Sequence, residues 1–117
     1  MPDRSIKIVA VDDSKKAGPA KCDPQEQEAW VGDNVTWNNK TDAAHWPWPT
    51  DASYQPRTDV QRGDLGGYMS DNIQAKQGSR PTFNVGCQPT VLYYYCKNHP
   101  NELSERSTIK VIKIPSP

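Results

Sequence analysis

Apolar and polar residues alternate over several short stretches of the chain, and turn residues separate these stretches. This period of two predicts half-buried β-strands. A continuous apolar and aromatic run at residues 91–96 predicts a buried strand instead. The other predicted strands lie at residues 5–11, 29–31, 35–37, 81–85 and 108–114. No segment has a convincing helical period, so we expect an all-β Greek-key sandwich forming one domain over residues 1–117.

The turns and long connections complete this outline. Gly32-Asp33-Asn34 favours a tight turn, so residues 28–38 are a candidate hairpin. Residues 12–27 are charged and rich in proline and glycine, and we interpret them as a long loop. Residues 50–79 contain few apolar side chains and predict a long excursion, with an edge strand or helical turn around 67–75.

Charge and hydropathy restrict the class of partner. The chain has 14 acidic and 14 basic residues among 117, and this balance argues against nucleic-acid binding. No apolar run approaches the roughly 20 residues that span a bilayer. Met1 directly before Pro2 resembles a start codon joined to a trimmed domain, so we expect an exported or membrane-anchored protein whose signal or anchor is absent.

Cys96 and His99 are the residues with the clearest chemistry. Cys96 ends the buried strand, and His99 follows three positions later on a loop. A thiolate and an imidazole at this spacing can share one ion, and this pair suits copper or zinc rather than calcium or magnesium. His45, the only other histidine, lies shortly after the strand at 35–37 and is the candidate third ligand.

These segments together resemble the cupredoxins, the small blue-copper proteins. The matching motifs are VGDNVTW at 31–37 followed by His45, YYCKNHP at 94–100, and the closing strand at 108–114. The resemblance implies one copper ion bound by His45, Cys96 and His99, and a function in one-electron transfer. It also implies an exported protein whose redox partner docks near His99. We expect a monomer and no enzymatic activity.

The fourth ligand departs from the family pattern. The short form of the ligand loop would place an axial methionine where Glu102 stands, and a loop longer by one residue would place Leu103 there. Met69 lies in the wrong segment. We favour Glu102 over Leu103 near the metal. A carboxylate ligand would stabilise Cu(II) and would resemble the site of nitrosocyanin, although the glutamate there comes from a different loop.

The cysteine count leaves a second question open. Three cysteines leave one thiol for a separate task, which we assign to Cys96. Cys22 and Cys87 could then form a disulfide in an oxidising compartment. Cupredoxin topology puts their segments at opposite ends of the sandwich, so the sequence leaves this pairing undecided.

Three other functions compete with electron transfer. The chain could carry copper without fast electron transfer, bind zinc, or serve as a metal-free interaction module. Two histidines are too few for a multicopper oxidase, and one cysteine on the ligand loop is too few for a binuclear copper domain. The run Trp46-Pro47-Trp48-Pro49 is either a lid over the sandwich or a docking patch.

Overall fold

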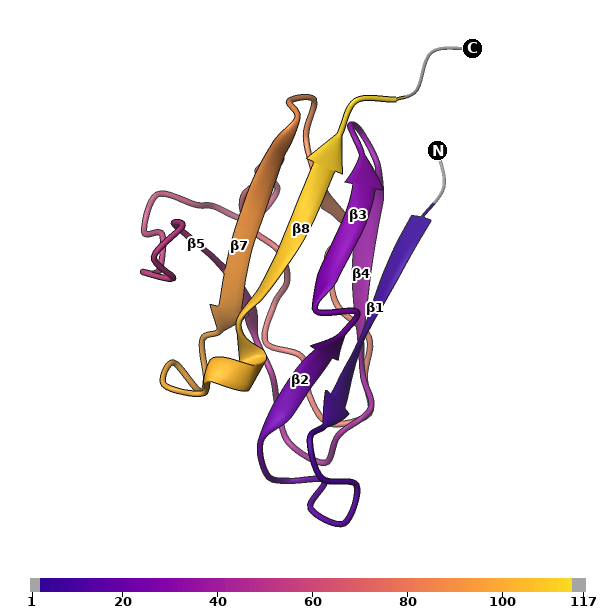
Figure 1. The fold of residues 1–117 in the computed structure, drawn as a ribbon, viewed down its shortest axis with the longest axis vertical. Helices are drawn as coiled ribbons and strands as arrows, with labels where there is room; N and C mark the ends of the chain where they lie inside the picture. Colours follow the sequence, from indigo (N-terminus) through magenta and orange to yellow (C-terminus); the bar gives the residue numbers. More distant parts are fainter. Residues whose placement is uncertain (1–2, 115–117) are drawn as a thin grey trace.

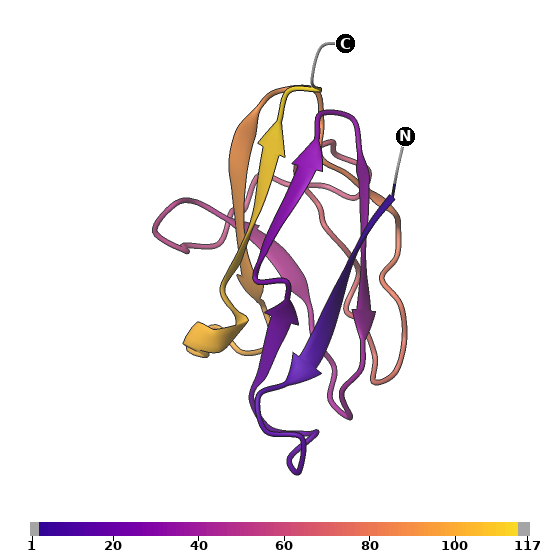
Figure 2. The same cartoon turned by 45° about the vertical axis from the view of Figure 1, so that its right-hand side comes forward.

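The computed structural model of the chain describes residues 3–114, which form two four-stranded β-sheets packed face to face (Figure 1; Figure 2). This arrangement confirms the predicted all-β sandwich. The first sheet has the order β2 (Ala20–Asp23), β1 (Asp3–Ala10), β4 (Asn34–Asn39), β6 (Phe83–Asn84). The second has the order β3 (Glu26–Trp30), β8 (Ser107–Ile112), β7 (Thr90–Cys96), β5 (Pro47–Thr50). A single 3-10 turn, η1, covers Leu103–Glu105 within the described part of the chain.

The core lies between the sheets and follows the alternation of the strands. In β4, for example, Val35, Trp37 and Asn39 are buried while their neighbours are half-exposed. Trp37 packs edge-on against Tyr94 of β7 with ring centroids 5.5 Å apart, so this contact joins the two sheets. Aromatic pairs of this geometry stabilise a core beyond the area that they bury.

The predicted hairpin at residues 28–38 is wrong, because β3 and β4 belong to different sheets. β3 pairs in parallel with β8, and β4 pairs in parallel with β1. Between them the chain turns at Gly32, whose φ of 82° favours glycine. The buried carboxylate of Asp33 accepts a hydrogen bond from the Trp30 N–H at 2.8 Å and fixes this crossing.

The predicted loop at residues 12–27 contains a strand that composition alone conceals. β2 pairs antiparallel with β1, and its Ala20 and Cys22 alternate inward between exposed neighbours. Pro19 and Pro24 flank the strand and give the segment the composition of a loop. β2 also lies against η1, the short turn that follows β7.

The excursion predicted at residues 50–79 begins one residue late, because Thr50 ends β5; no named strand or helix lies within the described residues 51–79. The edge strand or helical turn expected around 67–75 is replaced by an isolated β-bridge between Ile73 and His45. Met69 and Ile73 are fully buried, so the excursion closes one side of the core.

Cys22 and Cys87 carry free thiols, so the disulfide that the sequence left undecided is not formed in the structure. Cys87 is exposed beside Gly86, whose carbonyl accepts a hydrogen bond from the Gly32 N–H, whereas Cys22 is buried. Residues 3–114 include no helix with the length and apolar character of a membrane span.

Candidate metal centre

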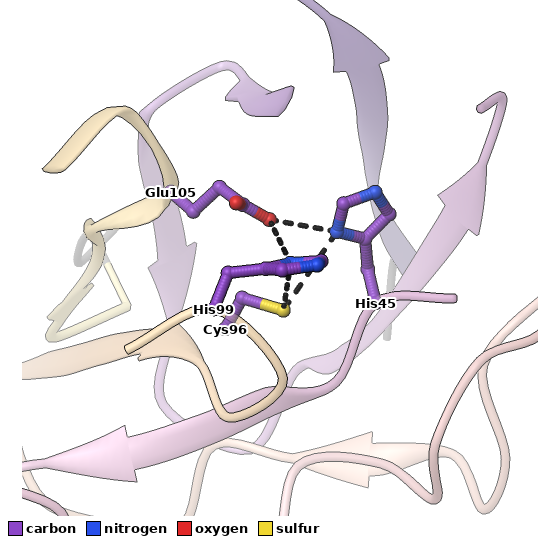
Figure 3. Close-up of side chains that lie close together, drawn as sticks. All are labelled: His45, Cys96, His99 and Glu105. Atoms are coloured by element: carbon purple, nitrogen blue, oxygen red, sulfur yellow. Dashed lines mark hydrogen bonds and ion pairs between the residues drawn. The ribbon is translucent and has the colours of Figure 1, made fainter. Parts of the chain in front are cut away.

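Four side chains with metal-binding atoms meet at one end of the sandwich (Figure 3). They are His45, Cys96, His99 and Glu105, and one donor atom from each lies within 4.8 Å of all the others. His45 precedes β5, Cys96 ends β7, His99 lies on the loop that follows, and Glu105 ends η1. Three of the four ligands expected from the sequence, His45, Cys96 and His99, are therefore brought together from two remote segments.

The distances among these donors are short. The Cys96 Sγ lies 3.7 Å from the His45 Nδ1 and 3.4 Å from the His99 Nδ1. One carboxylate oxygen of Glu105 lies 2.7 Å from the His45 Nδ1 and 3.3 Å from the His99 Nδ1. Both imidazole rings thus direct the same nitrogen toward the sulfur and the carboxylate.

The fourth member of the cluster is Glu105, whereas the sequence pattern favours Glu102. Glu102 is exposed and lies outside the cluster, and Leu103 is exposed as well. The reason is η1, which turns the chain by one short helical step and carries Glu105 inward. Extending the alternation of β8 backward from Val111 and Ile109 through Ser107 would have marked Glu105 as an inward position.

The fold relates this site to known proteins. A purple cupredoxin from Nitrosopumilus maritimus superposes with a TM-score of 0.67 at 20% identity, covering 94% of this chain and 100% of that one. A fern plastocyanin mutant superposes with a TM-score of 0.64 at 14% identity, covering 92% of this chain and 99% of that one. An amicyanin mutant superposes with a TM-score of 0.61 at 19% identity, covering 94% of this chain and 82% of that one.

The chain has the cupredoxin fold. At these identities the likeness concerns the fold, and the site must be judged from its own residues. A copper-containing nitrite reductase from Thermus scotoductus contains a similar unit, which this chain matches over 23% of that enzyme's length. No protein-family model matches this chain. A search of curated proteins also finds no match.

Within this cupredoxin fold, the position of His45 is fixed on both sides. Its backbone N–H and C=O exchange hydrogen bonds with Ile73, each 2.9 Å long. Upstream, the buried Asn39 amide donates to the Ala43 carbonyl at 2.8 Å and accepts from the Thr41 N–H at 2.9 Å. The backbone that carries His45 is therefore held by buried hydrogen bonds that do not depend on any ion.

Cys96 is 5% exposed. Burial raises the pKa of its thiol to about 12, although the Trp46 N–H, 3.3 Å from the sulfur, acts in the opposite direction. The carboxylate of Glu105 raises the pKa further. A bound cation would replace the thiol proton and offset the charge of Glu105.

The donor geometry fits a single copper-sized ion. With metal–sulfur and metal–nitrogen bonds of about 2.3 and 2.0 Å, as in zinc sites, a sulfur and a nitrogen sharing one tetrahedral ion lie about 3.5 Å apart. The two sulfur–nitrogen distances, 3.4 and 3.7 Å, bracket that value. The Glu105 oxygen lies 2.7 Å from the His45 Nδ1, which is the length of a hydrogen bond. Among the four metal-binding side chains, the Glu105 carboxylate would therefore move most when an ion binds.

Proposed function

We propose that the protein binds one copper ion through His45, Cys96, His99 and Glu105 and transfers single electrons between partner proteins. The observation that carries this proposal is the convergence of one sulfur, two imidazole nitrogens and one carboxylate at distances suited to one ion. A set of two histidines and one cysteine with a further weak or variable donor is the pattern of copper sites in electron transfer.

Rigidity of the site supports electron transfer. His45 and Cys96 are almost completely buried and are held by backbone hydrogen bonds and strand pairing. Donors that keep their positions in both oxidation states reduce the structural change that accompanies each electron. A site built this way therefore favours repeated one-electron cycles over chemical conversion of a substrate.

His99 is the proposed electron port. Its side chain is 36% exposed, whereas that of His45 is 2% exposed. Exposed Pro100 and Leu103 follow His99 on the same loop and offer apolar contact area to a redox partner. The expected docking of a partner near His99 is part of this proposal, as is the exported location that cupredoxins commonly have.

Glu105 gives the site a low reduction potential in this proposal. An anionic oxygen donor stabilises Cu(II) more than Cu(I) and favours a geometry less trigonal than that of a site with a weak neutral donor. The same carboxylate supports a second candidate function, a copper carrier without fast electron transfer. The two candidates differ in whether the bound copper exchanges electrons rapidly and reversibly.

The test begins with metal-free protein and one equivalent of Cu(II). We expect an intense visible absorption from thiolate-to-copper charge transfer, which is lost in Cys96→Ser and retained in Cys87→Ser as the matched control. Rapid reversible voltammetry of the copper form supports electron transfer, and slow voltammetry supports the carrier. A protein that prefers Zn(II) and develops no visible band would refute the copper proposal.

A further inference from the structure

A surface pocket of about 230 Å³ opens beside the candidate metal centre. Its wall combines two members of the metal cluster with one outer carboxylate and a stretch of small residues from the loop between β1 and β2. The lining residues are Ala17, Gly18, Pro19, His99, Glu102 and Glu105. The pocket therefore connects solvent with the side of the cluster formed by His99 and Glu105.

Charge makes this pocket suited to cations. Glu102 is exposed at the pocket, and the Glu105 side chain, 5% exposed, lies deeper. The described residues that line the pocket include no lysine or arginine. Two carboxylates in a concave surface raise the local concentration of a divalent cation and repel anions.

Elsewhere the cluster is nearly closed, because the second pocket that reaches His45, Cys96 and Glu105 holds only about 10 Å³. His45 and Cys96 expose only 1% and 5% of their surface, and the Trp46 backbone lies directly against the Cys96 sulfur. His99, which is more exposed than either, faces the pocket together with Glu105. An ion that approaches from solvent therefore meets Glu102, His99 and Glu105 before it meets the buried donors.

We propose that this pocket is the route by which copper enters and leaves the site, and that Glu102 is a transient ligand on that route. This inference rests on the proposed copper function. Glu102 captures hydrated Cu(II) through its carboxylate, the ion passes to His99 and Glu105, and Cys96 and His45 complete the coordination. The Cys96 thiol loses its proton to solvent in the last step, so charge balances without any oxidant.

A transient ligand has a kinetic signature that a permanent ligand lacks. Because a transient ligand stabilises the ion on its way in and on its way out, removal of Glu102 slows both binding and release, whereas loss of long-range attraction alone would slow binding and speed release. By Coulomb's law the charge of one exposed carboxylate changes the binding rate of a divalent ion by about threefold at low ionic strength. Salt at about 0.5 M removes most of that difference.

The experiment measures copper uptake by stopped flow in the full chain. Metal-free wild type, Glu102→Gln and Glu102→Lys are mixed with Cu(II), and the rise of the visible band and the quenching of tryptophan fluorescence are followed. Release is measured with excess chelator under conditions where the rate no longer depends on its concentration. Glu28→Gln and Glu28→Lys are matched controls, because Glu28 is exposed on β3. It lies opposite Lys110 of β8, which in turn lies opposite Val91 near the start of β7, whereas the metal cluster lies at the end of β7.

The Glu102 side chain makes no capping hydrogen bond to η1, so these variants are expected to fold normally. We expect uptake and release to slow together by about threefold in Glu102→Gln and by more in Glu102→Lys, with an unchanged spectrum and unchanged rates in the Glu28 variants. Equal rates in wild type and Glu102→Gln would overturn the route, and so would equal slowing in the Glu28 controls. A changed spectrum in Glu102→Gln would make Glu102 a permanent ligand and also overturn it. Absence of any visible band in the wild type would instead refute the proposed copper function.

Discussion

Replacing Glu105 by glutamine separates the charge of the fourth donor from its shape. Glutamine keeps the length of the side chain and a carbonyl oxygen, and it removes the negative charge 2.7 and 3.3 Å from the two imidazole nitrogens. The anion stabilises Cu(II) over Cu(I), so its removal raises the reduction potential of the bound copper.

The size of this shift follows from the geometry. At a separation of about 3 Å and an effective dielectric constant of about 20, one charge contributes about 5 kcal/mol. That energy corresponds to about 0.2 V for a one-electron couple. Because the amide oxygen retains a dipole and the site can relax, we expect an increase of about 0.1–0.2 V.

The assay is protein-film voltammetry of copper-loaded wild type, Glu105→Gln and Glu102→Gln at fixed pH and ionic strength. Glu102→Gln is the matched control, because it removes the same charge from an exposed position outside the cluster. We expect the control to shift the potential by no more than about 0.03 V. Equal shifts in the two variants, or a decrease in Glu105→Gln, would refute the assignment of Glu105 as the anionic donor.

Three further predictions concern the frame of the site. Asn39→Ala leaves several buried backbone groups without partners and lowers the free energy of unfolding by about 2–4 kcal/mol in urea denaturation; a loss below about 0.5 kcal/mol would contradict this role. Tyr94→Phe removes the oxygen that accepts from the Trp37 indole and costs about 1–2 kcal/mol, and an unchanged midpoint of thermal unfolding would refute it. In metal-free native protein the exposed thiol of Cys87 reacts rapidly with a thiol reagent. The Cys22 thiol stays unreactive until the protein unfolds, because burial shields it and raises its pKa. A mass change on reduction would indicate a disulfide instead.

Much of this architecture could be predicted from local patterns. The apolar run that forms β7 and the alternation that forms β8 are signals contained within single strands, so periodicity identifies them. The convergence of His45 with Cys96 requires the relative placement of two segments about 50 positions apart. That placement comes from the resemblance to cupredoxins, which supplies a topology that spacing alone does not contain.

Two of the differences between expectation and structure depend on how short segments turn between elements. The sequence predicts that β3 and β4 pair, although the buried Asp33 carboxylate stabilises a turn that sends them to different sheets. Counting along an assumed short loop favours Glu102 over Glu105, whereas η1 contracts that loop and reverses which carboxylate faces inward. The helical turn itself has no hydrophobic period long enough to detect in the sequence, so the signal that points to Glu105 is the alternation of β8 extended backward.

The central claim is that one sulfur and two imidazoles, contributed by distant parts of the chain, share a single ion. X-ray absorption spectroscopy at the copper edge of protein loaded with one equivalent tests it most directly. We expect one sulfur neighbour, two imidazole rings and one further light-atom donor. A copper environment with no sulfur neighbour, or with only one imidazole ring, would contradict it.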